Sequence, residues 1–224
     1  MWEERYLFIM TVNRFTFRGA LYGDFEAFKK AVDQDFEAIA PRIKSHELLA
    51  VVVQKYKQNI FIYIETPGTD IDPMQLFPSA SVMLCDWPGE ADMRKWVRMY
   101  DIFHYCKDLE VDEWLRSDPD TCPGTFIIKI KPEKVVSYIF YHFQLQEEME
   151  GDRSKYGSIY IDENLLVMYG ERPDTRISPD YRGILNTKNS PPDWGNLMQE
   201  HFIPLEDVKN WFRIENIKYM YATK

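Results

Sequence analysis

Two stretches of this sequence run through the same kinds of residue and end alike: Asn59-Ile-Phe-Ile-Tyr-Ile-Glu-Thr-Pro67 and Asn164-Leu-Leu-Val-Met-Tyr-Gly-Glu-Arg-Pro173. Their aliphatic and aromatic residues predict β-strands. A second strand-like run precedes each of them, at residues 48–54 and 156–161, and only a short polar turn lies between. Each stretch is therefore predicted to be one arm of a β-hairpin, and the pair indicates an internal repeat.

Further upstream, each hairpin is preceded by a predicted helix. Residues 24–45 carry apolar side chains at spacings of three and four, and Asp24 is a suitable N-cap. The second helix is predicted at residues 133–150, where Pro132 stands near the first turn. A predicted strand precedes each helix, at residues 5–12 and 124–130.

Downstream of each hairpin, the sequence predicts a polar loop and then a helix that carries tryptophan. These helices are expected at residues 90–106, with Trp96, and at residues 194–202, with Trp194. Residues 214–221 alternate well enough to form a closing strand. The corresponding strand of the first half is placed at residues 111–116, where the alternation is poor.

The order βαββαβ, found twice, predicts an α+β fold made of two tandem ferredoxin-like units. The first unit would span residues 1–116 and the second residues 124–224, joined by a turn-rich linker at 117–123. One face of such a sheet needs a cover, and two tandem copies can cover each other. We therefore expect an intramolecular, pseudo-dimeric α+β barrel, present as a monomer or as a homodimer, with a pocket between sheet and helices.

The composition limits the classes of partner. The 224 residues carry 27 Lys and Arg against 36 Asp and Glu, a net charge of −9, which argues against nucleic acid and anionic membranes as ligands. A neutral or cationic small partner fits this charge better, and the aromatic residues, 15% of the chain, are expected in part to line a pocket or an interface. Three widely spaced cysteines and the absence of a leader or a long apolar run predict a reduced, cytoplasmic protein.

One pair of side chains could carry acid–base chemistry. On the predicted helix, Tyr138 and His142 are four residues apart, which puts phenol and imidazole on one face. Such a pair can move a proton near neutral pH. A core histidine that bonds to a tyrosine is the more frequent origin of this spacing. The other three histidines, at positions 46, 104 and 201, favour structural or exposed roles.

The motifs of several large enzyme classes are absent from the sequence. It contains no HxH or HExxH motif and no EF-hand loop. It also lacks the glycine-rich phosphate loops and the GxSxG elbow of serine hydrolases. No metal ion and no cofactor are predicted.

The second half resembles the L-rhamnose mutarotase family, small proteins with a ferredoxin-like unit that forms dimeric α+β barrels. The resemblance rests on Ile130-Lys-Pro-Glu133, on Tyr138 and His142, on the predicted hairpin, on Trp194-Gly-Asn-Leu-Met198 and on the closing strand. It implies a catalytic role for His142 and Tyr138, and contact of Trp194 with a sugar ring. Strand alternation adds Tyr160 and Met168 as candidate substrate-binding residues.

This resemblance implies a sugar mutarotase, an isomerase of carbohydrate metabolism that interconverts the anomers of L-rhamnose or a related 6-deoxy sugar without cofactor. The first half has Phe28 and Val32 where the tyrosine and histidine would stand, so it is expected to be non-catalytic. The alternative from another class is a non-catalytic protein that binds a sugar or other small ligand, or serves in assembly. A different activity on the same barrel, such as cofactor-free oxygenation or haem chemistry, is a third possibility.

Overall fold

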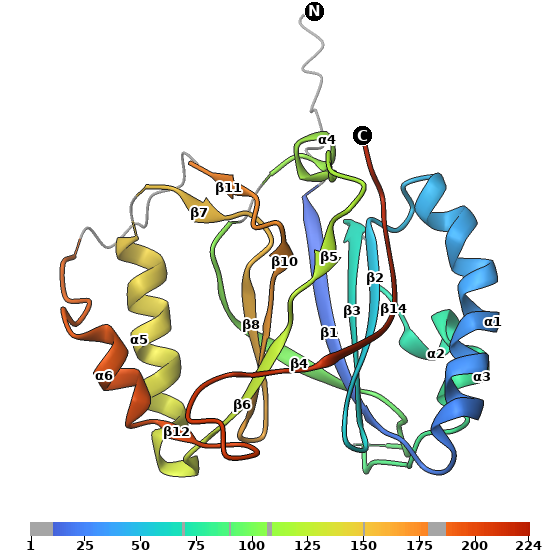
Figure 1. Ribbon diagram of the computed structural model, residues 1–224, viewed down its shortest axis with the longest axis horizontal. Coiled ribbons are helices and arrows are strands. Elements are labelled where there is room, and N and C mark those ends of the chain that lie inside the picture. The colour runs from blue at the N-terminus through green and yellow to red at the C-terminus, as the bar shows by residue number, and fades with distance from the viewer. Residues whose placement is uncertain (1–10, 69, 90, 107–108, 150, 179–186) are drawn as a thin grey trace, which may run out of the picture.

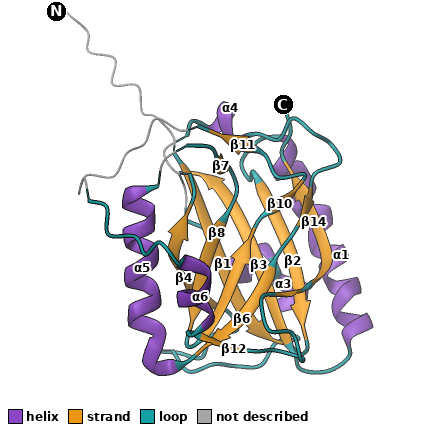
Figure 2. Ribbon diagram, turned by 60° about the vertical axis from the view of Figure 1, so that its left-hand side comes forward, coloured by secondary structure: helices purple, strands orange, loops and turns teal. Residues whose placement is uncertain are grey.

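Ten of the described strands pair into one curled antiparallel sheet with helices packed on its outside (Figure 1), and β5 with β10 and β7 with β11 form two small two-stranded sheets. The structure is a computed structural model that describes residues 11–68, 70–89, 91–106, 109–149, 151–178 and 187–224. Helix α1 lies on one side of the sheet, and α5 and α6 lie on the other (Figures 1 and 2). The fold is therefore mixed α+β, as the sequence predicts.

The first half of the chain contributes four strands and four helices to the described structure. In chain order they are β1 (Val12–Ala20), α1 (Phe25–Lys44), β2 (Ala50–Tyr56), β3 (Asn59–Pro67), α2 (Pro73–Leu76), α3 (Pro78–Ser81), β4 (Val97–His104) and α4 (Val111–Trp114). The predicted N-cap of α1 is confirmed, since the Asp24 carboxylate accepts a hydrogen bond from the backbone N–H of Ala27 at 2.7 Å.

The second half has two main helices and a larger number of short strands. In chain order they are β5 (Cys122–Pro123), β6 (Phe126–Ile130), the 3₁₀ turn Pro132–Lys134, α5 (Val135–Glu148), β7 (Arg153–Ser154), β8 (Ser158–Asp162), β9 (Leu165–Tyr169), β10 (Glu171–Arg172), β11 (Arg176–Ile177), α6 (Trp194–Gln199), β12 (Phe202–Ile203), β13 (Phe212–Arg213) and β14 (Glu215–Tyr221). Both predicted hairpins are confirmed, β2 with β3 and β8 with β9.

The order of strands shows that each half donates a strand to the other. Along the sheet the order is β12-β6-β9-β8-β4-β1-β3-β2-β14, and β13 also pairs with β6. Strand β4 pairs with β1 of its own half and then with β8 of the second half. Strand β14 pairs with β2 of the first half, while the β13 segment just before it pairs with β6. The closing strand is thus confirmed, with its partner in the opposite half.

Three predicted elements differ from the structure. Residues 5–10 of the predicted first strand lie outside the described residues, and the described strand runs from Val12 to Ala20. The predicted Trp96 helix at residues 90–106 is wrong, because strand β4 occupies Val97–His104. The strand predicted at residues 111–116 is also wrong, since Val111–Trp114 forms helix α4, closed by a capping box between Glu110 and Glu113.

The sheet has an outer face toward the helices and an inner face where the two halves meet. On the outer face, Ile159 and Ile161 of β8 pack in one cluster with Tyr138 of α5. On the inner face, the ring of Tyr63 in β3 stacks on that of Tyr169 in β9, with centroids 3.6 Å apart and an interplanar angle of 13°. The inner face therefore forms the joint between the halves, and the outer face under α5 is the place for a pocket.

Candidate functional site

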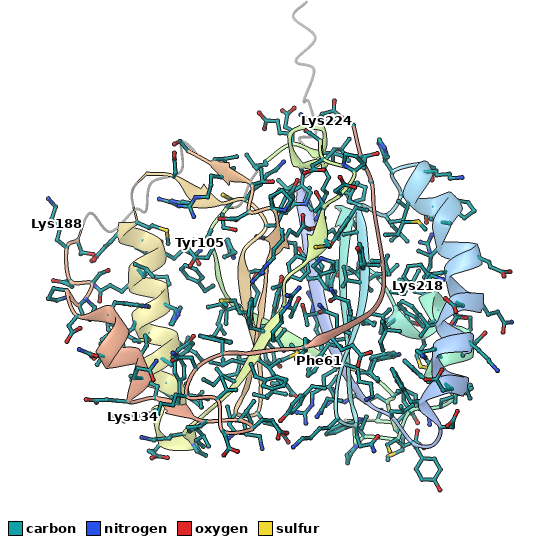
Figure 3. All side chains as sticks on the ribbon, in the orientation of Figure 1. Phe61, Tyr105, Lys134, Lys188, Lys218 and Lys224 are labelled. Atoms are coloured by element: carbon teal, nitrogen blue, oxygen red, sulfur yellow. The ribbon has the colours of Figure 1, made fainter. Side chains whose placement is uncertain are left out.

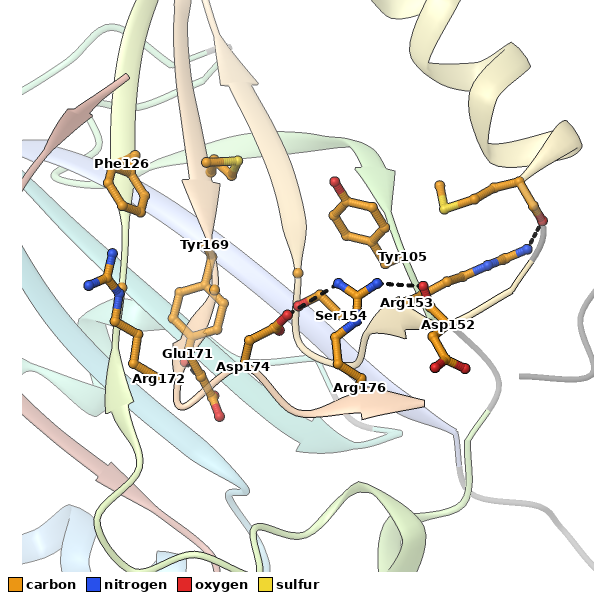
Figure 4. Close-up of a pocket in the computed structure, with 15 residues that line it drawn as sticks. Tyr105, Phe126, Asp152, Arg153, Ser154, Tyr169, Glu171, Arg172, Asp174 and Arg176 are labelled. Carbon is orange, nitrogen blue, oxygen red and sulfur yellow. Dashed lines mark hydrogen bonds and ion pairs between the residues drawn. The ribbon is translucent and has the colours of Figure 1, made fainter. Parts of the chain in front are cut away.

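An open pocket of about 500 Å³ lies beside the C-terminal end of α5, against the outer face of the second half (Figure 4). Its apolar wall consists of Tyr105, Phe126, Met149 and Met168. Phe126 and Met168 are direct neighbours across β6 and β9, so their side chains stand together on one face. Both are only partly buried. The pocket thus offers an apolar surface that the protein's own side chains do not cover.

Two glycines leave room for the side chains that shape the pocket. A Cβ atom at Gly157 would come within 2.5 Å of the Tyr105 ring, and one at Gly124 would lie 3.3 Å from the Arg172 side chain. Tyr105 lies between α5 and the sheet (Figure 3), and burial raises the pKa of its phenol. Because both positions are glycine, the Tyr105 ring can lie against the backbone at Gly157, and the Arg172 side chain can lie against it at Gly124.

The rim of the pocket is charged and mostly neutralised by its own contacts. Arg176 bonds to the Asp174 carboxylate at 3.3 Å and to the backbone carbonyl of Asp152 at 2.6 Å. Arg153 donates to the backbone carbonyl of Met149. The guanidinium of Arg172 is exposed and lies 5.9 Å from the centre of the Phe126 ring. Among the described residues, the Arg172 side chain has no ion pair or hydrogen bond, so its charge faces the solvent beside the apolar wall.

Two further lining residues of the pocket, Tyr169 and Glu171, belong to a buried ionic network that crosses the joint between the two halves. The guanidinium of Arg116 donates to both oxygens of Glu65, at 2.5 and 2.9 Å, and to both oxygens of Glu171, at 2.5 and 3.2 Å. All three side chains are at most 1% exposed. Glu65 comes from the end of β3 and Glu171 from β10, so one arginine holds together the two Glu-x-Pro segments of the repeat.

Tyrosines from both halves complete this network in the same way. Tyr63 donates to Glu65 at 2.6 Å, and Tyr169 donates to Glu171 at 2.7 Å. Glu65 also accepts from the indole of Trp114 at 2.8 Å. Burial raises the pKa of both carboxylates, but Arg116 and the extra donor outweigh it at Glu65, whose net pKa is lowered, whereas that of Glu171 is raised. Glu65 is therefore the better stabilised anion.

The structure brings three of the predicted site residues together. The rings of Tyr138 and His142 on α5 are 4.0 Å apart, and Trp194 of α6 lies 5.0 Å from the His142 ring. Tyr138 is 1% exposed and His142 is 4% exposed. His142 uses its Nδ1 atom to donate to the backbone carbonyl of Tyr138 at 2.9 Å, a bond within the helix. None of the three residues lines the pocket described above.

Burial keeps both titratable groups of this cluster neutral. It lowers the pKa of His142 to about 4 and raises the pKa of Tyr138 well above its ordinary value. Phe103 packs edge-on against the imidazole at 5.4 Å. At neutral pH His142 is therefore an uncharged member of an aromatic cluster, in a surrounding that disfavours proton uptake.

The other two predicted residues lie apart. Met168 belongs to the wall of the pocket. Tyr160 is on the opposite face of the sheet, in the inner core, where its ring is 6.3 Å from that of Tyr63. The sequence analysis missed Tyr105, Arg116 and Arg172. The one sequence signal for this site was the repeated Glu-x-Pro segment. It contains Glu65 and Glu171, the two acids that bind Arg116 at the joint.

The described residues contain neither a metal-binding cluster nor a membrane-spanning helix. They contain no group of three or more histidine, cysteine, aspartate or glutamate side chains arranged to hold a metal ion. Within the same residues, no helix has both the length and the apolar character that a bilayer crossing requires.

No model of a known protein family matches this chain, and no curated protein matches it. Similar solved structures include one from Fusobacterium nucleatum subsp. nucleatum, described as a "putative monooxygenase", with 10% identity, 97% of each chain covered and a TM-score of 0.43. A second structure with the same description, from Lactobacillus acidophilus, has 6% identity, covers 95% of this chain and 97% of its own, and has a TM-score of 0.44.

A third similar structure is described as an anthrone oxidase-like protein, with 5% identity, 96% of this chain and 94% of the other covered, and a TM-score of 0.38. The predicted membership of the L-rhamnose mutarotase family, and with it the sugar isomerase activity, is wrong. No family model matches, and these three structures are described as monooxygenase or oxidase-like. The Tyr138 and His142 spacing that suggested it belongs to a buried aromatic cluster.

Proposed function

We propose that this protein binds a planar, anionic aromatic molecule in the pocket beside α5. The ring system of the ligand would lie on Phe126 and Met168, and its carboxylate or phenolate would meet Arg172. Flat rings gain from contact with aromatic faces and with the polarisable sulfur of methionine. At about 500 Å³, the pocket is within the usual range for small-molecule sites.

The observation that carries this proposal is the state of Arg172. The other two rim arginines bond to protein oxygens, but the Arg172 side chain has neither an ion pair nor a hydrogen bond among the described residues. It stands next to Phe126, on the space that Gly124 leaves open. An arginine beside a ring presents donors at the edge of an apolar surface, where a carboxylate can accept two hydrogen bonds.

The test uses 2-naphthoate and its neutral amide, 2-naphthamide, as matched probes in calorimetric titrations. We expect the wild-type protein to prefer naphthoate, and Arg172→Gln to weaken naphthoate binding about 10-fold, since one charge-assisted contact at an exposed site is removed. Naphthamide binding should change little. Gly157→Val should reduce binding of both probes, because the added side chain displaces the Tyr105 ring.

Arg98→Gln is the matched control. Arg98 is also exposed and lies over a phenylalanine, Phe15, at 4.8 Å, but in the first half of the chain. This substitution should leave both affinities unchanged. Equal affinity of the wild-type protein for naphthoate and naphthamide, or equal loss in the two arginine variants, would contradict the proposal.

We further propose that the chain is a tandem of two ferredoxin-like units, residues 1–116 and 124–224 with the linker 117–123 between them, joined as a pseudo-dimer. Strand order supports this. The order β4-β1-β3-β2 of the first half matches β12-β6-β9-β8 of the second. The last strand of each half also behaves alike: β4 pairs with β8, the first hairpin strand of the second half, and β14 pairs with β2, the first hairpin strand of the first half.

Irregularities in the exchanged strands support the same proposal. The register of β4 against β8 shifts between Asp101 and Phe103, and that of β14 against β2 shifts between Asn216 and Lys218. Bulges at corresponding places are a feature of related folds. In this interpretation, a single chain already contains the interface that two separate units would otherwise form, so the pseudo-dimer is complete as a monomer.

A further inference from the structure

Among the described residues, several polar atoms on the inner face are buried without a hydrogen-bond partner. They include Nη1 of Arg14 and Oγ1 of Thr16, together with the hydroxyls of Ser158 and Tyr160, which have no partner apart from each other. Thr16, Ser158 and Tyr160 are between 0 and 2% exposed. An unsatisfied buried polar group costs about 1–3 kcal/mol, so a cluster of them on one surface calls for a common partner.

Strand pairing places these atoms in one region. Arg14 and Thr16 stand on the same face of β1, opposite Glu65 and Tyr63 of β3. Ser158 and Tyr160 share one face of β8, and the Tyr160 ring lies 6.3 Å from that of Tyr63. Tyr63 therefore connects the two pairs across the inner face.

Arg14 is near two carboxylates but pairs with neither. Although burial opposes it, Asp101 and Glu65 are among the groups that raise the pKa of Arg14. Its guanidinium lies 5.4 Å from the centre of the Trp114 ring and has no ion pair among the described residues. The oxygens of the nearby Glu65 are taken by Arg116, Tyr63 and Trp114. Asp101, opposite Tyr160 on β4, bonds instead to the backbone N–H of Phe103 and to the ring of His104.

The matching position in the other half is closed by side chains. There Gln54, which faces Asn216 across β2 and β14, donates to its Oδ1 atom at 2.7 Å. Asn216 in turn donates to the backbone carbonyl of Pro123 at 3.0 Å. Within the described part of the chain, Thr125 Oγ1 in the second half is also without a hydrogen-bond partner, so the difference between the two sides is confined to two positions. The Gln54 and Asn216 position is satisfied by side chains, whereas the Tyr160 position opposite Asp101 is not.

We propose that the inner face binds a small monovalent anion, such as a halide or formate, between the guanidinium of Arg14 and the hydroxyl of Tyr160. The hydroxyls of Thr16 and Ser158 would complete the shell, because a hydroxyl can rotate to donate and an arginine only donates. Thr16, Ser158 and Tyr160 are almost completely buried and Arg14 is half-buried, which favours a small ion. The site lies on the face opposite the pocket with Arg172 and does not depend on its ligand.

The first test is a crystal of the wild-type protein grown in sodium bromide, with data collected at the bromine absorption edge. The proposal predicts an anomalous peak within hydrogen-bond distance of Arg14 Nη1 and Tyr160 OH. Density there without anomalous signal, which indicates water alone, would overturn it. This test requires no variant.

The second test measures thermal unfolding as bromide replaces gluconate at constant ionic strength. Bromide at ten times its Kd should raise the Tm of the wild-type protein and of the Arg98→Gln control by about 3 °C. The rise should be absent in Arg14→Gln and reduced in Tyr160→Phe, which keeps the ring and removes only the hydroxyl. If Arg14→Gln does not fold, the rise in Tm of Tyr160→Phe with bromide still tests the site. An equal rise in the control and in the folded site variants would reject the site.

Discussion

Arg116 balances the charge of two buried carboxylates, because its single guanidinium donates hydrogen bonds to both. Without it, Glu65 and Glu171 would face each other as unpaired buried charges. We expect Arg116→Met to lower the free energy of unfolding by about 3–5 kcal/mol at pH 7. Chemical denaturation measures this loss in the free energy of unfolding. The triple variant that also carries Glu65→Gln and Glu171→Gln should lose less, because it leaves no buried charge unpaired.

The deficit of Arg116→Met should depend on pH in a defined direction. Removal of the cation raises the folded-state pKa of Glu65 above the unfolded value of about 4.3, and raises further that of Glu171, which is already elevated in the wild-type protein. Groups with a raised pKa contribute stability below their unfolded pKa and lose it as pH rises through the folded pKa. The difference between variant and wild type should therefore shrink from pH 8 to pH 5. A difference that grows on acidification would contradict this account of the network.

His142 predicts the opposite dependence in the wild-type protein. Burial lowers its folded-state pKa from 6.5 to about 4, so the unfolded chain takes up the proton first as pH falls. Stability should decline between about pH 6.5 and pH 4, by roughly 3 kcal/mol at most. Denaturation curves of wild type and His142→Phe across this range measure the contribution. The variant should lack that part of the decline, and parallel curves would disprove the assignment.

At the scale of elements, strand β4 shows how a local pattern can be misread. Its residues alternate, with Val97 and Met99 buried and Arg98 and Tyr100 exposed, which is the period of a strand. Trp96 and Met99, three residues apart, suggested a helix instead. The bulge between Asp101 and Phe103 shifts the side chains from one face to the other, so the window as a whole shows neither period clearly.

Glu148 ties the last turn of α5 to the segment before α6. Its carboxylate accepts from the backbone N–H groups of Asn189 and Ser190, at 2.8 and 2.6 Å, and from the hydroxyl of Thr187. Although burial opposes this, these bonds hold the pKa of Glu148 well below its usual range. Glu148→Gln should speed hydrogen exchange at both amides about 10-fold, since one charge-assisted bond at each is weakened. Glu133→Gln, an exposed carboxylate in the 3₁₀ turn just before α5, is the control and should leave both amides unchanged.

On the scale of the whole molecule, the exchange of β4 and β14 makes each half dependent on the other. Without the second half, β2 would lack β14 and the end of β4 would lack β8, and both edges would expose unpaired backbone groups. We expect residues 1–121 alone to fail to form a stable monomer, as measured by sedimentation and circular dichroism. A mixture with residues 122–224 should restore a 1:1 complex. A folded, monomeric fragment would show that the exchange contributes little.

The local elements were largely predictable from sequence. Apolar spacing and an aspartate cap identified α1, and alternation with short polar turns identified both hairpins and β14. Each of these signals comes from residues within one element. The pocket could not be predicted in this way, because Tyr105, Phe126 and Met168 belong to three separate segments and meet only in the folded sheet.

By itself, the sequence determined that the chain is an α+β protein with two similar hairpins, since periodicity and turn chemistry act over a few residues. Only the tertiary structure decided which half each last strand joins, that the two repeated glutamates share Arg116, and that Tyr138 and His142 are buried. Burial and charge compensation are properties of the surroundings of a side chain. Those surroundings come from residues more than 50 positions away, such as Glu65 and Glu171 around Arg116.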